Sequence, residues 1–80
     1  MSGKLTETEV RMQYAIRQFE ASKLRAMMFH AKSLAYSAGN CPQDAMKCTE
    51  TMGRHIHLME ESMDFIDECL RKQAGVDQKT

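Results

Sequence analysis

The chain lacks tryptophan, contains a single proline and has aromatic side chains at only 6% of its positions. Strands favour valine, isoleucine, threonine and aromatic residues at alternating positions, and no stretch of this sequence follows that pattern. A strand-rich fold is therefore excluded. Because so little proline interrupts it, the chain can form long helices, and the sequence predicts an all-α protein.

Net charge is absent as well, since 11 basic residues balance 11 acidic ones. A neutral chain has little electrostatic drive toward DNA, so neither general nor sequence-specific DNA binding is expected. No apolar run approaches the ~20 residues of a membrane-spanning helix, and none resembles the core of a signal peptide. We expect a cytoplasmic protein with no membrane contact, forming one small domain over residues 1–80.

Two helices are delimited by their terminal residues. Thr6 and Glu9 have the spacing of a capping box, which predicts a helix over about residues 6–38. Gly39 is expected to supply the left-handed residue that ends it. Pro42 suits the first turn of a second helix over about residues 42–74, with Cys41 as its N-cap and Gly75 at its end.

A short turn between two long helices predicts an antiparallel helical hairpin, with frayed tails at residues 1–4 and 76–80. In the second helix, apolar residues recur three and four positions apart, as in a coiled-coil seam. This seam comprises Ala45, Met52, Ile56, Met59, Met63, Ile66 and Leu70.

The first helix carries a less regular apolar stripe. It comprises Met12, Ile16, Phe19, Met27, Ala31 and Leu34. The step of eleven residues from Ile16 to Met27 suits straight packing rather than a strict heptad. Further apolar residues widen both stripes beyond what one partner helix can cover, so we expect a four-helix bundle, at least a dimer, or a higher homo-oligomer.

Charge is unevenly distributed along the chain. Residues 1–40 contain six basic and three acidic side chains, whereas residues 41–80 contain five basic and eight acidic ones. In an antiparallel hairpin, the half near the turn is therefore basic and the half near the termini is acidic. Cations followed by aromatic residues four positions later, on the exposed polar side of the first helix, mark a candidate ligand or partner site in the basic half. Its residues are Arg25, Phe29, Lys32, Tyr36, Arg54 and His57. The alternative is that the aromatic residues fill a second oligomer interface.

Cysteine and histidine are present, but their spacing does not suit a metal site. Cys41 and Cys48 are two helical turns apart, about 10 Å, and Cys69 belongs at the opposite end of the hairpin. His55 and His57 point about 200° apart on a helix. We expect Cys48 and Cys69 to be small core residues, His55 to be packed, and no metal or other cofactor to be bound.

No catalytic motif is present, which predicts that the chain is not an enzyme. The opening Leu5-Thr6-x-x-Glu9 and the hairpin format are similar to those of viral cyclic-nucleotide sponge proteins, and the format resembles small helical accessory proteins of phages and plasmids. This resemblance implies an inhibitor or anti-defence role and transfers no functional residue. The leading hypothesis is a protein-binding adaptor or inhibitor. The alternatives are sequestration of a small anionic ligand such as a cyclic nucleotide and, third, a metal- or redox-responsive regulator.

Overall fold

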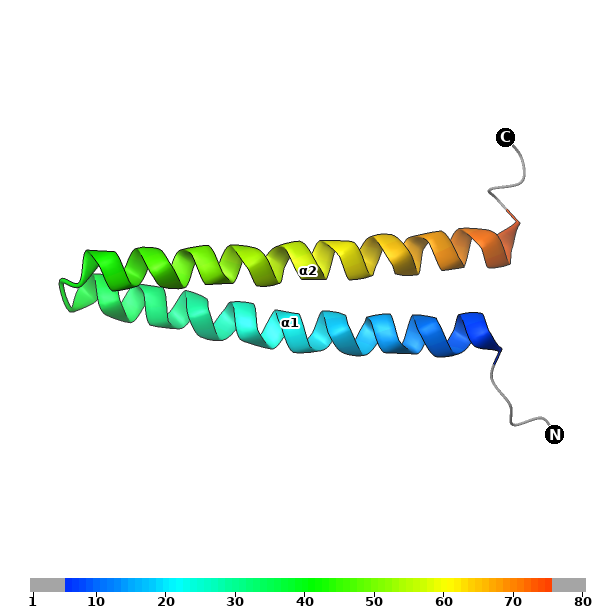
Figure 1. Cartoon of the computed structure of the whole chain (residues 1–80), viewed down its shortest axis with the longest axis horizontal. Coiled ribbons are helices and arrows are strands. Elements are labelled where there is room, and N and C mark those ends of the chain that lie inside the picture. Colours follow the sequence, from blue (N-terminus) through cyan, green and yellow to red (C-terminus); the bar gives the residue numbers. More distant parts are fainter. Residues whose placement is uncertain (1–5, 76–80) are drawn as a thin grey trace.

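The computed structural model describes residues 6–75, which form two antiparallel α-helices joined by a tight turn (Figure 1). α1 comprises Glu7–Ala38 and α2 comprises Pro42–Ala74. No strand occurs within residues 6–75, so the all-α hairpin and both helix ranges are confirmed. The tails expected at residues 1–4 and 76–80 lie outside the described residues, as does Leu5.

The predicted capping box starts α1. The Glu9 N–H donates to Thr6 Oγ1 at 3.1 Å, and the Thr6 N–H donates to Glu9 Oε1 at 2.8 Å. Two backbone N–H groups at the start of the helix, those of Thr6 and Glu9, thereby find side-chain acceptors. At the other end of the hairpin, α2 begins with Cys41 as N-cap and Pro42 in its first turn, and it ends at Gly75, which has a φ of 75°.

The left-handed residue of the turn is Asn40, with a φ of 64°, and the prediction that Gly39 takes this role is wrong, since its φ is −87°. The Asn40 N–H donates to the Ser37 carbonyl at 3.1 Å, and the Cys41 N–H donates to the Tyr36 carbonyl at 2.8 Å. These two bonds form a Schellman turn centred on Asn40. Asparagine tolerates the left-handed region better than other side chains, so Gly39 can keep a right-handed conformation.

The helices pack through a seam of small side chains. Its buried members are Ala15, Ser22, Ala26 and Ser33 from α1 and Ala45, Cys48 and Cys69 from α2. Half-buried residues complete the same three-and-four spacing: Met12, Phe19 and Phe29 from α1, and Met52, His55, Met59, Ser62 and Ile66 from α2. Ser22 is the most deeply buried, at 1% exposure. The expectation that Cys48 and Cys69 are small core residues is confirmed.

The predicted apolar stripes coincide with this seam only in part. Ala45 lies on it buried, and Met12, Phe19, Met52, Met59 and Ile66 lie on it half-buried. The exposed members are Ile16, Met27, Ala31 and Leu34 on α1 and Ile56, Met63 and Leu70 on α2. The seam of α1 does not skip eleven residues between Ile16 and Met27 as expected. The small residues Ser22 and Ala26 continue the heptad between the larger ones without a break. Small contact residues also let helix axes approach closely.

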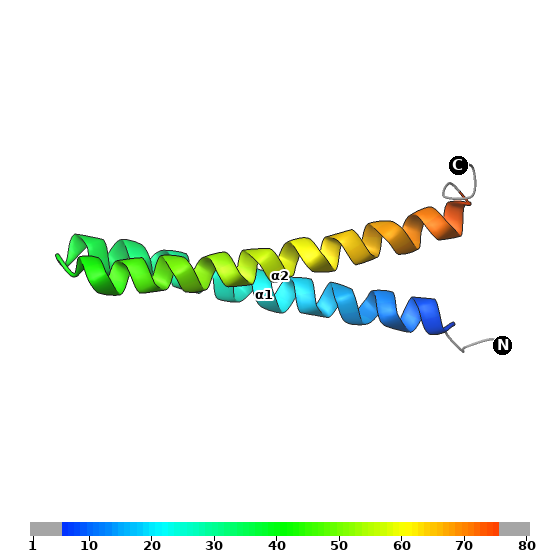
Figure 2. The same cartoon turned by 45° about the horizontal axis from the view of Figure 1, so that its top comes forward.

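The hairpin is elongated, with a radius of gyration of 17.8 Å against about 12 Å for a compact domain of this length. The helices lie closest near the turn and diverge toward the termini in both views (Figures 1 and 2). Next to the turn the seam consists of Ser33, Ala45 and Cys48, which are all small, whereas toward the termini it includes Met12, Phe19, Met59 and Ile66. The larger side chains hold the helices further apart, which accounts for the divergence.

One polar link joins the helices near the turn. The Ser33 hydroxyl donates to the Ala45 carbonyl at 3.2 Å, and Ser33 Oγ and Thr49 Oγ1 share a hydrogen bond of 2.9 Å. Thr49 Oγ1 also donates to the Ala45 carbonyl at 3.1 Å. Ser33 is buried and Thr49 is exposed, and their two hydroxyl protons are shared among these three contacts. The link therefore fixes the register of α2 against α1 near the turn.

Candidate functional site

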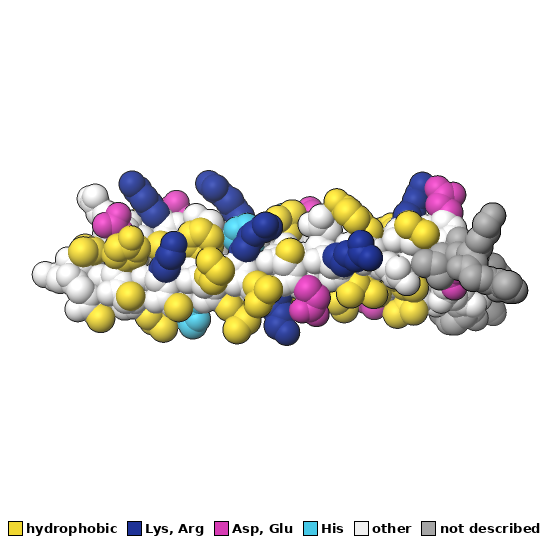
Figure 3. Space-filling model, turned by 90° about the horizontal axis from the view of Figure 1, so that it is seen from below, with side chains coloured by type: hydrophobic (Ala, Val, Ile, Leu, Met, Phe, Trp, Pro, Cys, Tyr) yellow, Lys and Arg dark blue, Asp and Glu magenta, His cyan; other side chains and the backbone are white. Residues whose placement is uncertain are grey.

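The hairpin has two long faces, one on each side of the seam, and we name the first the apolar face. It consists of Ile16, Met27 and Leu34 from α1 and Met46, Ile56, Met63 and Leu70 from α2. Their heptad positions lie on the same side of both helices, and each side chain is at least 40% exposed. Apolar side chains also run along the hairpin when it is seen from the α1 side, with Lys and Arg side chains among them (Figure 3).

Two shallow hollows adjoin on the apolar face, and both are lined by Ile56 and Met59. The hollow toward the turn has a volume of about 340 Å³, and the hollow toward the termini has a volume of about 240 Å³. Their rims differ in charge: Lys23 lines the first, beside His30, and Glu60 and Asp64 line the second. The apolar face therefore changes from basic to acidic at the middle of the hairpin.

The second face, here the basic face, lies on the opposite side of the seam in the turn half. Its cations are Arg25, Lys32, Lys47 and Arg54, and all are exposed. Each ion pair among the described residues joins positions four apart within one helix, and none includes these four cations. Their charges are therefore available to an anionic partner.

An aromatic stack lies at the base of the basic face. The rings of Phe29 and His55 are 5.9 Å apart with an interplanar angle of 15°, and Lys32 Nζ lies 5.3 Å from the Phe29 centroid. The prediction that Phe29 lies on the exposed polar side is wrong: it is half-buried on the seam, because the heptad continues through Ser22 and Phe29. His55 is packed, as expected, and its Nδ1 is buried without a hydrogen-bond partner among the described residues.

The structure brings together most of the predicted site residues. Arg25, Phe29, Lys32 and Arg54 share the basic face, and Tyr36 lies near the turn at 40% exposure. His57 does not join them. It lies on the outer side of α2, where its Nε2 is 3.0 Å from Glu61 Oε2, because two residues along a helix turn a side chain by about 200° from His55.

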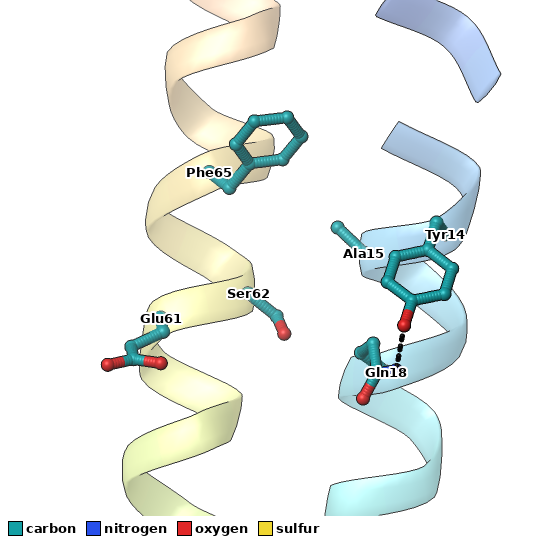
Figure 4. A pocket seen from close by; sticks show the side chains of 6 residues that line it. All are labelled: Tyr14, Ala15, Gln18, Glu61, Ser62 and Phe65. Atoms are coloured by element: carbon teal, nitrogen blue, oxygen red, sulfur yellow. Dashed lines mark hydrogen bonds between the residues drawn. The ribbon is translucent and has the colours of Figure 1, made fainter. Parts of the chain in front are cut away.

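Sequence reasoning missed a third hollow, of about 270 Å³, between the terminal halves of the helices (Figure 4). Its lining residues are Tyr14, Ala15, Gln18, Glu61, Ser62 and Phe65. Phe65 and Ser62 point from α2 toward α1, and Gln18 Nε2 donates to Tyr14 Oη at 2.8 Å. Ala15 and Ser62 are small, and their side chains leave this space on the seam. The sequence could have indicated the hollow, because an antiparallel hairpin with its turn near residue 40 places these two small residues opposite each other.

All three cysteines are free thiols; Cys41 is exposed, and Cys48 and Cys69 are buried in the seam. Cys41 Sγ donates to the Gly39 carbonyl at 3.7 Å and makes no capping bond to α2. Among residues 6–75, no group of three or more His, Cys, Asp or Glu side chains is placed to hold a metal ion. Neither described helix has the length and apolarity needed to cross a membrane.

Fold and surface together define an elongated helical hairpin with one apolar and one basic face. Comparison of the chain with protein-family models, with curated proteins and with solved structures finds no match.

Proposed function

We propose that this chain is a non-enzymatic binding protein, an adaptor or inhibitor that acts by contact with other macromolecules and works as a homo-oligomer. One observation carries the proposal. Among the described residues, no Leu, Ile, Val, Met, Phe or Tyr side chain is fully buried, and the buried seam consists of Ala, Ser and Cys. Since burying one large apolar side chain contributes about 1.5–3 kcal/mol, the apolar face holds unused binding free energy.

The form of the apolar face supports a protein partner. Its hollows are shallow and follow the groove between the helices, whereas sites for small substrates enclose most of the ligand. Apolar side chains at helical spacing suit a helix laid into a groove. Methionine, here Met27, Met46, Met59 and Met63, adapts its shape to a partner more readily than branched side chains do.

Two matched variants test the proposal. Ile56→Asp places a charge on the apolar face, and Leu24→Asp places the same charge on the outer side of α1, where Leu24 is 60% exposed. The tagged proteins are cross-linked and captured from the native cell, and their helicity is checked by circular dichroism. We expect Leu24→Asp to retain the partners of the wild type and Ile56→Asp to lose them. Identical partners for both folded variants would contradict the proposal.

A second candidate function is sequestration of a small anionic ligand such as a nucleotide. The basic face favours it, because its four cations have no ion-pair partner among the described residues and one of them, Lys32, lies 5.3 Å from the Phe29 ring that stacks on His55. Cations can hold phosphate while an aromatic ring stacks on a base.

Calorimetric titration with ATP and with cyclic AMP tests this second function. The double variant Arg25→Glu, Lys32→Glu should abolish binding and change the free energy of unfolding by no more than about 0.5 kcal/mol for each exposed substitution. Equal affinity of the variant and the wild type would place any such ligand elsewhere.

A further inference from the structure

We propose that the apolar face is occupied by a second copy of this chain, packed antiparallel so that the turn of each hairpin lies over the terminal half of the other. Because the proposed function already assigns this face to protein contact, the identity of the occupant rests on that function.

Charge along the hairpin selects this orientation. Residues 23–57 contain five basic and two acidic side chains, a net charge of +3, while residues 6–22 and 58–75 together contain four basic and eight acidic side chains, a net charge of −4. A parallel pair would place like-charged halves on each other, and an antiparallel pair places opposite charges together twice. Complementary potentials of this kind fix the register of an interface.

The hollows of the apolar face repeat this complementarity locally. The basic rim of Lys23 and His30 and the acidic rim of Glu60 and Asp64 lie on either side of their shared lining residues. A two-fold axis that lies in the plane of the face and crosses the helices beside Met59 brings the α1 rim with Lys23 of one copy to the same level along the hairpin as the α2 rim with Glu60 and Asp64 of the other. The same patch then serves both copies, as a closed two-fold dimer requires.

This axis also brings together the apolar side chains at the two ends of the α2 stripe. It passes near residue 58, the midpoint of α2, and lays α2 of one copy against α2 of the other. Residues equally far from the midpoint then face each other. Leu70 of one copy meets Met46 of the second copy, and Met63 of one copy meets Gly53 of the second copy.

Gly53 supports this arrangement. A glycine inside a helix costs about 1 kcal/mol relative to alanine, yet an added Cβ at Gly53 would meet no atom within 4 Å. The hairpin alone therefore has no need of glycine at this position. Because Gly53 has no side chain, it leaves space on the α2 surface for the flexible Met63 side chain of a second copy. We call this space the Met63 seat.

The available area matches a stable dimer. The stripe from Met46 to Leu70 is about 36 Å long at 1.5 Å per residue, and two helices side by side are about 20 Å wide. The face therefore measures roughly 700 Å², close to the ~800 Å² that each partner contributes to a standard interface.

Sedimentation equilibrium tests the contact. The wild type should have twice the monomer mass of 9.2 kDa. Gly53→Leu should weaken dimerisation about 10-fold or more by filling the Met63 seat, while Glu50→Leu, on the outer side of α2, should leave it unchanged. Both variants should keep their helicity. A wild type that stays monomeric, or equal dimerisation of both variants, would overturn the inference.

Disulfide cross-linking tests the orientation, in a Cys41→Ser background that removes the exposed native thiol. A mixture of Met46→Cys and Leu70→Cys chains should form a disulfide between the two kinds of chain, and Met46→Cys alone should not. Efficient linking of Met46→Cys to itself would show a parallel pair. If the wild type is monomeric while Ile56→Asp still loses its cellular partners, the dimer and the homo-oligomer part of the proposed function fail, and contact of the apolar face with another protein stands. If the dimer forms as described but both Asp variants keep the same cellular partners, the dimer stands and the proposed contact of the apolar face with another protein fails.

Discussion

Replacing Ser22 by leucine tests whether small residues hold the two helices together. Ser22 is 1% exposed, and neighbouring seam positions leave no room for a larger side chain without separating the helices. Overpacking of this kind costs about 1–3 kcal/mol, a large part of the roughly 4–12 kcal/mol expected for a domain of this length. At about 4–8 °C for each kcal/mol, the melting temperature should fall by at least about 4 °C and by as much as about 24 °C.

The assay is thermal unfolding followed by far-ultraviolet circular dichroism at one fixed protein concentration, since the proposed dimer would make stability depend on concentration. Ser37→Leu is the matched control, because Ser37 is exposed near the end of α1. Ser22→Ala preserves the small seam and should melt close to the wild type. A seam of large apolar residues would instead gain free energy from Ser22→Leu. A raised or unchanged melting temperature would therefore refute the close packing described here.

Three smaller predictions concern the ends and the turn of the hairpin. Ser33→Ala removes the hydroxyl shared with Thr49 and should lower the free energy of unfolding by about 1 kcal/mol in urea titration; an unchanged midpoint would mean that the link contributes nothing. Thr6→Ala breaks the capping box and should cost about 1 kcal/mol, seen as faster amide exchange in the first turn of α1, with Thr8→Ala as control. Asn40→Ala should cost about 1–2 kcal/mol because alanine resists a positive φ, whereas Asn40→Gly should be tolerated; equal loss in both would assign the effect to the asparagine side chain.

The ends of the helices could be predicted from the sequence because their signals are local. The Thr6 and Glu9 pair and Pro42 each act within one turn of helix, where neighbouring residues determine the backbone. That Asn40 rather than Gly39 is the left-handed residue after α1 could not be predicted from such local signals. Both residues tolerate the left-handed region, and the choice depends on which carbonyls the N–H groups of Asn40 and Cys41 reach.

The seam was harder to predict because the most hydrophobic residues of these helices are not the ones that pack between them. Ile56 and Leu70 are far more apolar than Ser22 or Ala26, yet they lie on the surface. What places a residue on the seam is the three-and-four spacing, which Ala15, Ser22, Ala26 and their partners keep without interruption. Phe29 was expected on the exposed side of the first helix because it follows a cation by four positions, but the heptad that runs through Ser22 places it half-buried on the seam.

The hairpin has one turn and a single seam, and this has a consequence for how the chain folds. Contacts beside Asn40 close short loops, and each pair further from the turn closes a longer one, at a slowly rising cost in chain entropy. The tight turn and the Ser33 link therefore form first, and pairing then proceeds toward the termini like a zipper. Opening follows the opposite order. Amide exchange should be slowest near Ser33 and Ala45 and rise steadily toward the two diverging ends, so that a single chain has a gradient of local stability along its length.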